Sequence, residues 1–163
     1  MSAIAPERPA TGEPRLVPMH SRDVPEIMAI ETRAYATPWT PGNFVDSLAA
    51  GYLAFVLREP DSAELTGYFL AMKGAGEMHL LNITVAPERE GQGLARLMLD
   101  RLCAMCREQG CEQLWLEVRV GNARARRVYQ RYGFAEVGLR KRYYPTASGP
   151  REDAVLMSLA VPA

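Results

Sequence analysis

The sequence predicts an α/β fold in which a mixed, mostly antiparallel sheet carries helices on both faces. Apolar runs at 52–58, 65–72 and 78–85 are separated by turn residues, a pattern typical of consecutive antiparallel strands. The third run leads into a stretch from 94 to 105 with leucine and methionine at helical spacing, and another strand follows at 113–120. A helix between two strands lets them be parallel neighbours joined by a right-handed crossover, so we expect one parallel pair.

The segment before these strands adds an edge strand and two helices. Residues 15–19 form a short strand that belongs at a sheet edge because it contains a proline. Ser21 is a plausible N-cap for a helix that should end near Tyr35. A stiff, proline-containing loop at 37–41 then precedes a second short helix at 42–50.

The C-terminal segment adds one helix and two strands. Asn122 is expected to cap a helix at 123–132, and Gly133 ends it with the left-handed backbone that glycine favours. Strands at 135–144 and 154–160 complete the sheet.

Length and composition indicate one ordinary globular domain. The chain has 163 residues, 48% hydrophobic and 23% charged. Residues 1–14, rich in Ala, Pro and Glu, show too little apolar periodicity to fold alone and are predicted to be a disordered tail. Residues 15–163 contain no visible repeat or linker, so we expect a single domain there.

The charge balance gives no reason to expect nucleic acid or membrane as a partner. Nineteen basic residues match nineteen acidic ones, so the formal net charge is zero. The sequence has no apolar run of membrane-spanning length and no signal-peptide pattern at its start, and we expect a cytoplasmic protein.

The cysteines are expected to be buried thiols. Cys103 and Cys106 form C-x-x-C inside an apolar helical pattern, and Cys111 follows shortly after. His20 and His79 are far away in the sequence, and no second cysteine pair exists. A zinc or redox role remains the alternative, but small residues packing a helix explain the pattern better, and no metal is expected.

The most informative stretch is the junction at 83–96, I-T-V-A-P-E-R-E-G-Q-G-L-A-R. A strand ends there, Gly91 and Gly93 allow an unusual backbone, and the long helix begins. A helix N-terminus offers unpaired N–H groups and the positive end of the helix dipole, which suits a diphosphate. The stretch matches neither the Walker loop nor G-x-G-x-x-G, and a plain tight connection is the alternative.

The order strand, G-x-G turn, helix, strand, capped helix and G-F resembles the GCN5-related N-acetyltransferase (GNAT) family. In that family the turn reads Q/R-x-x-G-x-G/A and holds the diphosphate of acetyl-CoA. Here the turn spans Glu90 to Ala95, and Glu90 departs from the pattern. Because a carboxylate near two phosphates is unfavourable, we expect Glu90 to point to solvent or to Arg89, and we expect weaker cofactor binding than is usual in the family.

A closer likeness, to the RimI-type enzymes, covers residues 15–160. These enzymes acetylate the N-terminal alanine of a small-subunit ribosomal protein. The matching motifs are L-W-L-E-V-R at 114–119, N-A at 122–123, Y-x-x-x-G-F at 129–134, R-Y-Y-P at 142–145, R-E-D-A at 151–154 and Trp39 after a proline.

The resemblance implies two catalytic residues. Glu117 would be the base that takes the amine proton, while the alternative is a solvent-facing glutamate paired with Arg119 on the same strand face. Tyr129 would give a proton to the CoA thiolate, and its alternative is an amphipathic core tyrosine.

The resemblance also implies where acetyl-CoA and the acceptor bind. The expected cofactor-binding residues are the backbone of Ile83, Thr84 and Val85, the turn and helix start at Gly91, Gln92, Gly93, Leu94, Ala95 and Arg96, and Asn122. Trp39, Tyr143 and Tyr144 would be the walls of a groove for the N-terminus of the acceptor protein. Two other functions stay open: acetylation of lysines, polyamines or drug amines, and acyl-CoA binding without catalysis.

Overall fold

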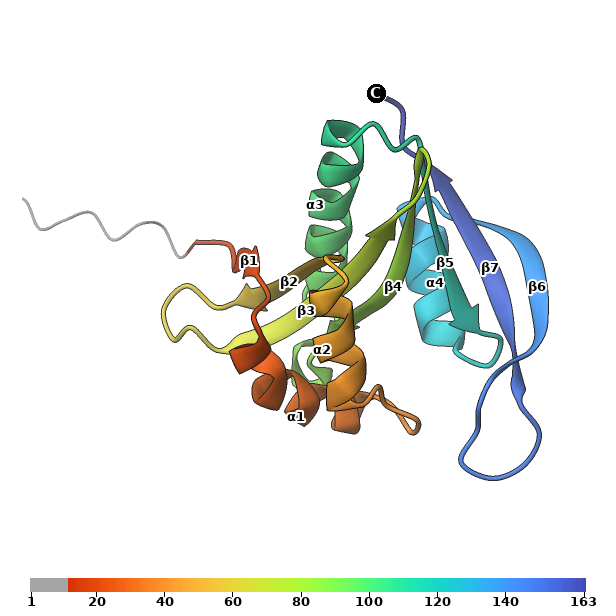
Figure 1. Cartoon of the computed structure of the whole chain (residues 1–163), viewed down its shortest axis with the longest axis horizontal. Coiled ribbons are helices and arrows are strands. Elements are labelled where there is room, and N and C mark those ends of the chain that lie inside the picture. The colour runs from red at the N-terminus through yellow and green to blue at the C-terminus, as the bar shows by residue number, and fades with distance from the viewer. Residues whose placement is uncertain (1–11) are drawn as a thin grey trace, which may run out of the picture.

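The structure is a computed structural model that describes residues 12–163, with a seven-stranded mixed sheet at its centre (Figure 1). The strands are β1 (Arg15–Pro18), β2 (Leu53–Arg58), β3 (Leu65–Lys73), β4 (Glu77–Val85), β5 (Gln113–Arg119), β6 (Ala135–Tyr144) and β7 (Glu152–Ala160). Their order in the sheet is β1-β2-β3-β4-β5-β7-β6. Among the strands of the described residues, only β4 and β5 pair in parallel, as the intervening helix predicts. Of the predicted tail, residues 1–11 lie outside the described part of the chain.

The helices are α1 (Val24–Ala34), α2 (Pro41–Ala49), α3 (Leu94–Glu108) and α4 (Ala123–Tyr132), with short 3-10 turns at Ser21–Asp23 and Pro87–Arg89. The predicted capping role of Ser21 is wrong. The carboxylate of Asp23 accepts the backbone N–H of His20 at 2.8 Å, and the 3-10 turn precedes the helix. Within residues 12–163, no helix is both long and apolar enough to span a membrane.

Two apolar clusters cover the two faces of the sheet. α3 and α4 pack on one face, where Met98 and Leu102 meet Phe69 of β3. α1 and α2 pack on the other face, where Ile27 and Phe44 belong to the second cluster. The cores therefore confirm the prediction of helices on both faces.

A β-bulge in β4 changes which side chains face which helices. Leu80 pairs with Ala71 of β3 and Asn82 pairs with Leu70, so Leu81 is the extra residue. Before the bulge, Leu80 belongs to the cluster under α3; after it, Asn82 bonds to Glu31 of α1. A one-residue insertion reverses the alternation because side chains in a strand have a period of two.

β4 and β5 separate beyond this bulge. Their parallel pairing runs only from Glu77–Gln113 to Leu80–Leu116. In Figure 1 the two strands lie together near the C-terminus of the chain and move apart toward the opposite end of the sheet. The edge of β4 at Ile83 to Val85 is consequently left without a strand on its β5 side.

A buried carboxylate fixes the loop between α1 and α2 to this part of the sheet. Glu31 is 1% exposed and accepts hydrogen bonds from the Tyr68 hydroxyl at 2.6 Å, the Asn82 amide at 3.2 Å and the Trp39 backbone N–H at 2.9 Å. Thr40 then caps α2 by accepting the N–H of Asn43 at 3.1 Å. α2 therefore begins at Pro41, inside the predicted loop, because proline suits the first turn of a helix.

We predict that Glu31→Gln lowers the free energy of unfolding by about 1–3 kcal/mol. Glutamine replaces one carboxylate oxygen with an NH₂ group, and this donor would then face a hydrogen-bond donor that the oxygen now accepts from. Urea denaturation followed by circular dichroism measures the change. Glu108→Gln, at an exposed site on α3, is the matched control and should leave stability nearly unchanged. Equal stability of the two variants would contradict the anchoring role of Glu31.

Candidate active site

Two cavities meet in the opening between β4 and β5. The cavity beside α1, about 440 Å³, is called the α1-side cavity, and the cavity beside the start of α3, about 700 Å³, is called the α3-side cavity. Residues lining both are Tyr35, Ile83, Asn122, Ala125 and Tyr129. The opening therefore connects the helix layer of α1 and α2 with the layer of α3 and α4.

The α3-side cavity contains the glycine turn predicted from the sequence. Gly91 and Gly93 have φ values of 80° and 79°, which side chains with a Cβ rarely adopt. In the described chain no side chain caps α3, so its first N–H groups remain available to a ligand. Both glycines line the cavity together with Leu94, Ala95 and Arg96, whereas Gln92 is exposed and does not.

Arginine side chains bring positive charge to this cavity, which suits an anionic ligand. Arg124, Arg127 and Arg131 of α4 line it opposite the turn. The side chain of Glu90 is exposed, as expected, but it forms its ion pair with Arg124, at 3.1 Å, and not with Arg89. Arg89 instead pairs with Glu64 at 2.9 Å, because the 3-10 turn before Glu90 directs it toward the β2–β3 loop.

The predicted backbone edge at Ile83, Thr84 and Val85 lines the α3-side cavity. Tyr35 reaches this edge from the end of α1: its hydroxyl lies 3.3 Å from the carbonyl oxygen of Ile83, to which it donates, and 2.7 Å from Oγ1 of Thr84. Burial raises the pKa of Tyr35 to about 12. Nothing in its sequence context signals this position, since it depends on how α1 packs on the sheet.

Glu117 of β5 lines the α1-side cavity, with a side chain only 6% exposed. Its Oε2 lies 2.6 Å from Nε2 of His79, and its Oε1 lies 3.5 Å from Nε of Arg140. The alternative of a solvent-facing glutamate paired with Arg119 is wrong. The contact between His79 and Glu117 was not predicted from the sequence. It depends on the parallel register that sets His79 beside Trp115, and neither strand alone encodes that register.

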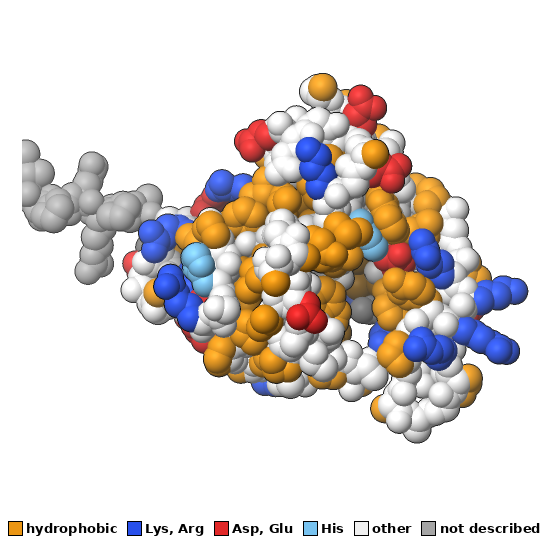
Figure 2. Space-filling model, viewed as in Figure 1, with side chains coloured by type: hydrophobic (Ala, Val, Ile, Leu, Met, Phe, Trp, Pro, Cys, Tyr) orange, Lys and Arg blue, Asp and Glu red, His pale blue; other side chains and the backbone are white. Residues whose placement is uncertain are grey.

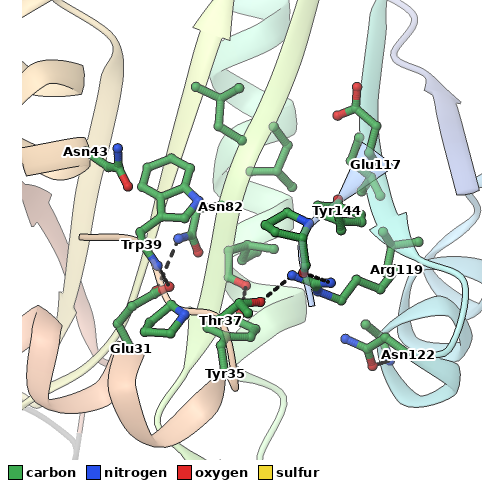
Figure 3. Close-up of a pocket in the computed structure, with 18 of the residues that line it drawn as sticks. Glu31, Tyr35, Thr37, Trp39, Asn43, Asn82, Glu117, Arg119, Asn122 and Tyr144 are labelled. Atoms are coloured by element: carbon green, nitrogen blue, oxygen red, sulfur yellow. Dashed lines mark hydrogen bonds between the residues drawn. The ribbon is translucent and has the colours of Figure 1, made fainter. Parts of the chain in front are cut away.

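Arg119 instead ties together the segments at the mouth of the α1-side cavity (Figure 3). Its guanidinium donates to Oγ1 of Thr37 on the α1–α2 loop and to the carbonyl oxygen of Pro145 at 2.9 Å. It also lies 4.5 Å above the ring of Tyr144. One side chain thus links β5, the α1–α2 loop and the β6–β7 connection.

Tyr129 occupies the junction of the two cavities. Its ring packs edge-on against Phe134 at 5.7 Å, and burial raises the pKa of its phenol well above the ordinary value. The hydroxyl therefore stays protonated at neutral pH. Asn122 caps α4 as predicted, accepting the N–H of Ala125 at 3.1 Å, and also lines both cavities.

Of the expected acceptor-binding aromatics, Trp39 and Tyr144 line the α1-side cavity, but Tyr143 does not. Tyr143 is 39% exposed and meets Tyr144 edge-on at 4.9 Å. Adjacent residues of a strand point to opposite sides, which explains why only one of the two reaches the cavity.

The cysteines belong to the core beneath α3. Cys103, Cys106 and Cys111 are buried free thiols, and none of them lines either cavity at the opening. Among the described residues, no cluster of three or more His, Cys, Asp or Glu side chains is placed to hold a metal ion.

Comparison with known proteins finds relatives that are named as acetyltransferases. A family model described as acetyltransferase (GNAT) family matches residues 24–134. The [ribosomal protein bS18]-alanine N-acetyltransferase of Escherichia coli strain K12 is 36% identical over 143 residues, covering 88% of this chain and 95% of that protein. The enzyme of the same name from Haemophilus influenzae is 37% identical over 136 residues, covering 83% and 91%.

Solved structures show the same likeness. The crystal structure of the ribosomal-protein-S18-alanine N-acetyltransferase from Escherichia coli matches with a TM-score of 0.81 at 35% identity, covering 91% of this chain and 94% of that one. Ard1 from Thermoplasma volcanium matches with a TM-score of 0.80 at 20% identity over 93% and 100%, which shows a shared fold. With this sheet, this turn before α3 and these relatives, the chain belongs to the GNAT family of acetyltransferases and resembles its RimI-type members, as the motifs predict.

Proposed function

We propose that this protein transfers the acetyl group of acetyl-CoA to the N-terminal α-amine of a protein that begins with alanine. The observation that carries the proposal is the opening through the sheet, with Glu117 on one side and Tyr129 at the junction. The relatives named above act on ribosomal protein bS18, which makes the corresponding protein the first acceptor to test.

The α3-side cavity fits acetyl-CoA. Backbone N–H groups at the start of α3 and the arginines of α4 would bind the diphosphate, and the free edge of β4 at Ile83 to Val85 would pair with the pantetheine amides. Acetyl-CoA supplies an activated thioester, whose carbonyl carbon accepts the amine while the thiolate leaves. The edge of β4 would direct that thioester to the junction, next to Tyr129.

Glu117 is the proposed base on the acceptor side. An α-amine has a pKa near ~8, so a carboxylate suffices to take its proton, directly or through water. The neutral amine nitrogen then forms the new bond to the acetyl carbon as the carbon–sulfur bond breaks, and the second proton that the nitrogen loses to become an amide replaces, through water, the proton that Tyr129 gives to the thiolate. Glu117 holds the proton lost by the amine until it passes to solvent.

Tyr129 is the proposed proton donor to the departing thiolate. It lines both cavities where they meet, and its hydroxyl would lie near the thioester and the amine when both are bound. Because burial raises its pKa, the phenol keeps its proton until the charge on sulfur develops. Direct transfer needs no covalent carrier, and the cysteines lie outside both cavities.

The α1-side cavity would admit the acceptor by its chain end. Trp39 and Tyr144 would flank the first residues of the peptide, and Arg119 closes the mouth between the α1–α2 loop and the β6–β7 connection. Alanine as the first residue is proposed from the relatives named above, and serine is the next candidate. Lysine or polyamine acetylation is the competing function.

We predict that Glu117→Gln lowers kcat by roughly 10²-fold or more, because it removes the base and keeps the shape. Acetyl-CoA binding should be unchanged, since Glu117 does not line the α3-side cavity. Steady-state kinetics and calorimetry measure the two quantities. Activity within twofold of the wild type at pH 7 would refute the assignment.

We predict that Glu90→Gln binds acetyl-CoA as tightly as the wild type or up to about fivefold more tightly, because Arg124 is released from an exposed ion pair. Arg124→Gln should weaken binding about fivefold, by losing a charge-assisted contact to phosphate. Arg101→Gln, exposed on α3 outside the cavity, is the control. Weaker calorimetric binding by Glu90→Gln would show that its carboxylate holds the turn.

We predict that Tyr144→Ala raises the KM for an alanine-starting peptide about 10-fold, while the KM for acetyl-CoA changes little. Tyr143→Ala, its neighbour outside the cavity, should have a much smaller effect. Mass spectrometry of an alanine-starting peptide with one internal lysine then identifies the acetylated nitrogen. Predominant modification of the lysine, or equal activity on a free polyamine, would favour the competing function.

A further inference from the structure

His79 of β4 makes the shortest polar contact of Glu117. Its Nε2 lies 2.6 Å from Oε2 of Glu117, and the two side chains are 13% and 6% exposed. Glu117 lines the α1-side cavity and His79 does not, so His79 contacts the carboxylate without itself lining the cavity. Any effect of His79 on the reaction would therefore pass through Glu117.

Trp115 fixes the plane of the His79 ring. The two residues are direct partners in the parallel pair of β4 and β5. Their rings stack with centroids 3.7 Å apart and planes inclined by only 7°. Glu117 follows Trp115 by two positions and emerges on the same face, so the stacked ring presents its Nε2 edge to the carboxylate.

The hydrogen bond has a defined direction when Glu117 is ionised. A carboxylate only accepts hydrogen bonds, so Nε2 of His79 must carry the proton. The other neighbour, Arg140, has a side chain 49% exposed and lies farther away, with its Nε 3.5 Å from Oε1. The short, enclosed bond from His79 is thus the main compensation for burying this carboxylate.

We propose that His79 is a positioning residue for the base. By engaging Oε2, it holds one rotamer of Glu117 and leaves Oε1 for the amine or for a bridging water. The proposal rests on the proposed role of Glu117 as the proton acceptor.

Two substitutions separate the hydrogen bond from the stacking. His79→Phe keeps a flat ring against Trp115 and removes the donor, whereas His79→Gln keeps an N–H donor at a similar reach. Each is made in the wild-type chain, and His79→Phe is also made together with Glu117→Gln. Circular dichroism and acetyl-CoA calorimetry check that every variant is folded and binds the co-substrate.

We expect His79→Phe to lower kcat on the order of 10-fold, a part of what a positioned base contributes, with little change in either KM. His79→Gln should stay within about threefold of the wild type, because the donor is retained. In the Glu117→Gln background, His79→Phe should cause no further loss, because residues that act as a unit are not additive.

Three results would overturn the positioning role: wild-type kcat in His79→Phe, equal losses in His79→Phe and His79→Gln, or an undiminished loss in the Glu117→Gln background. Full activity of Glu117→Gln would instead remove the proposed base, and the role of His79 with it. An inactive Glu117→Gln beside a fully active His79→Phe would leave the proposed function standing and reject only this inference.

Discussion

β4 and β5 exchange hydrogen bonds only as far as Leu80, and the candidate site depends on their separation beyond that point. The extra residue at Leu81 turns the following side chains to the other face and lets the strand bend away from β5. The separation leaves an open backbone edge on β4 and a passage between the two helix layers. A continuous sheet would have neither, because both faces would be closed by packed side chains.

The walls of this opening are held by buried polar groups rather than by apolar packing alone. Glu31 and Glu117 are carboxylates with little exposure on the α1 side of the sheet, and each is matched by donors from other elements. Glu31 fixes the α1–α2 loop to the sheet with neutral donors. Glu117 instead shares a short hydrogen bond of 2.6 Å with the imidazole of His79.

The charges divide between the cavities in a way that suits two different ligands. Arginines of α4 line the same cavity as the uncapped start of α3, a combination that suits an anion, and one of them, Arg124, forms an ion pair with Glu90. The α1-side cavity is instead bordered by aromatic rings and by the Arg119 link, which suits a peptide backbone. Figure 2 shows Lys and Arg side chains at both ends of one face, on the β6 side and on the β1 side, with hydrophobic side chains prominent across the middle between them.

The sequence by itself determined the order of the elements, the parallel pair and the glycine turn, because periodicity, caps and turn residues are local signals that each segment carries alone. The resemblance of its motifs to a known family also marked Glu117, Tyr129 and Asn122 as candidate site residues, and all three line the cavities at the opening. Only the tertiary structure decided the partners of Glu117, the pairing of Glu90 with Arg124 and the placement of Tyr144 but not Tyr143 at the cavity. Those outcomes depend on strand register, on the bulge at Leu81 and on how α1 and α4 pack across the opening. They are set by contacts between distant segments, and no single stretch of the chain encodes them.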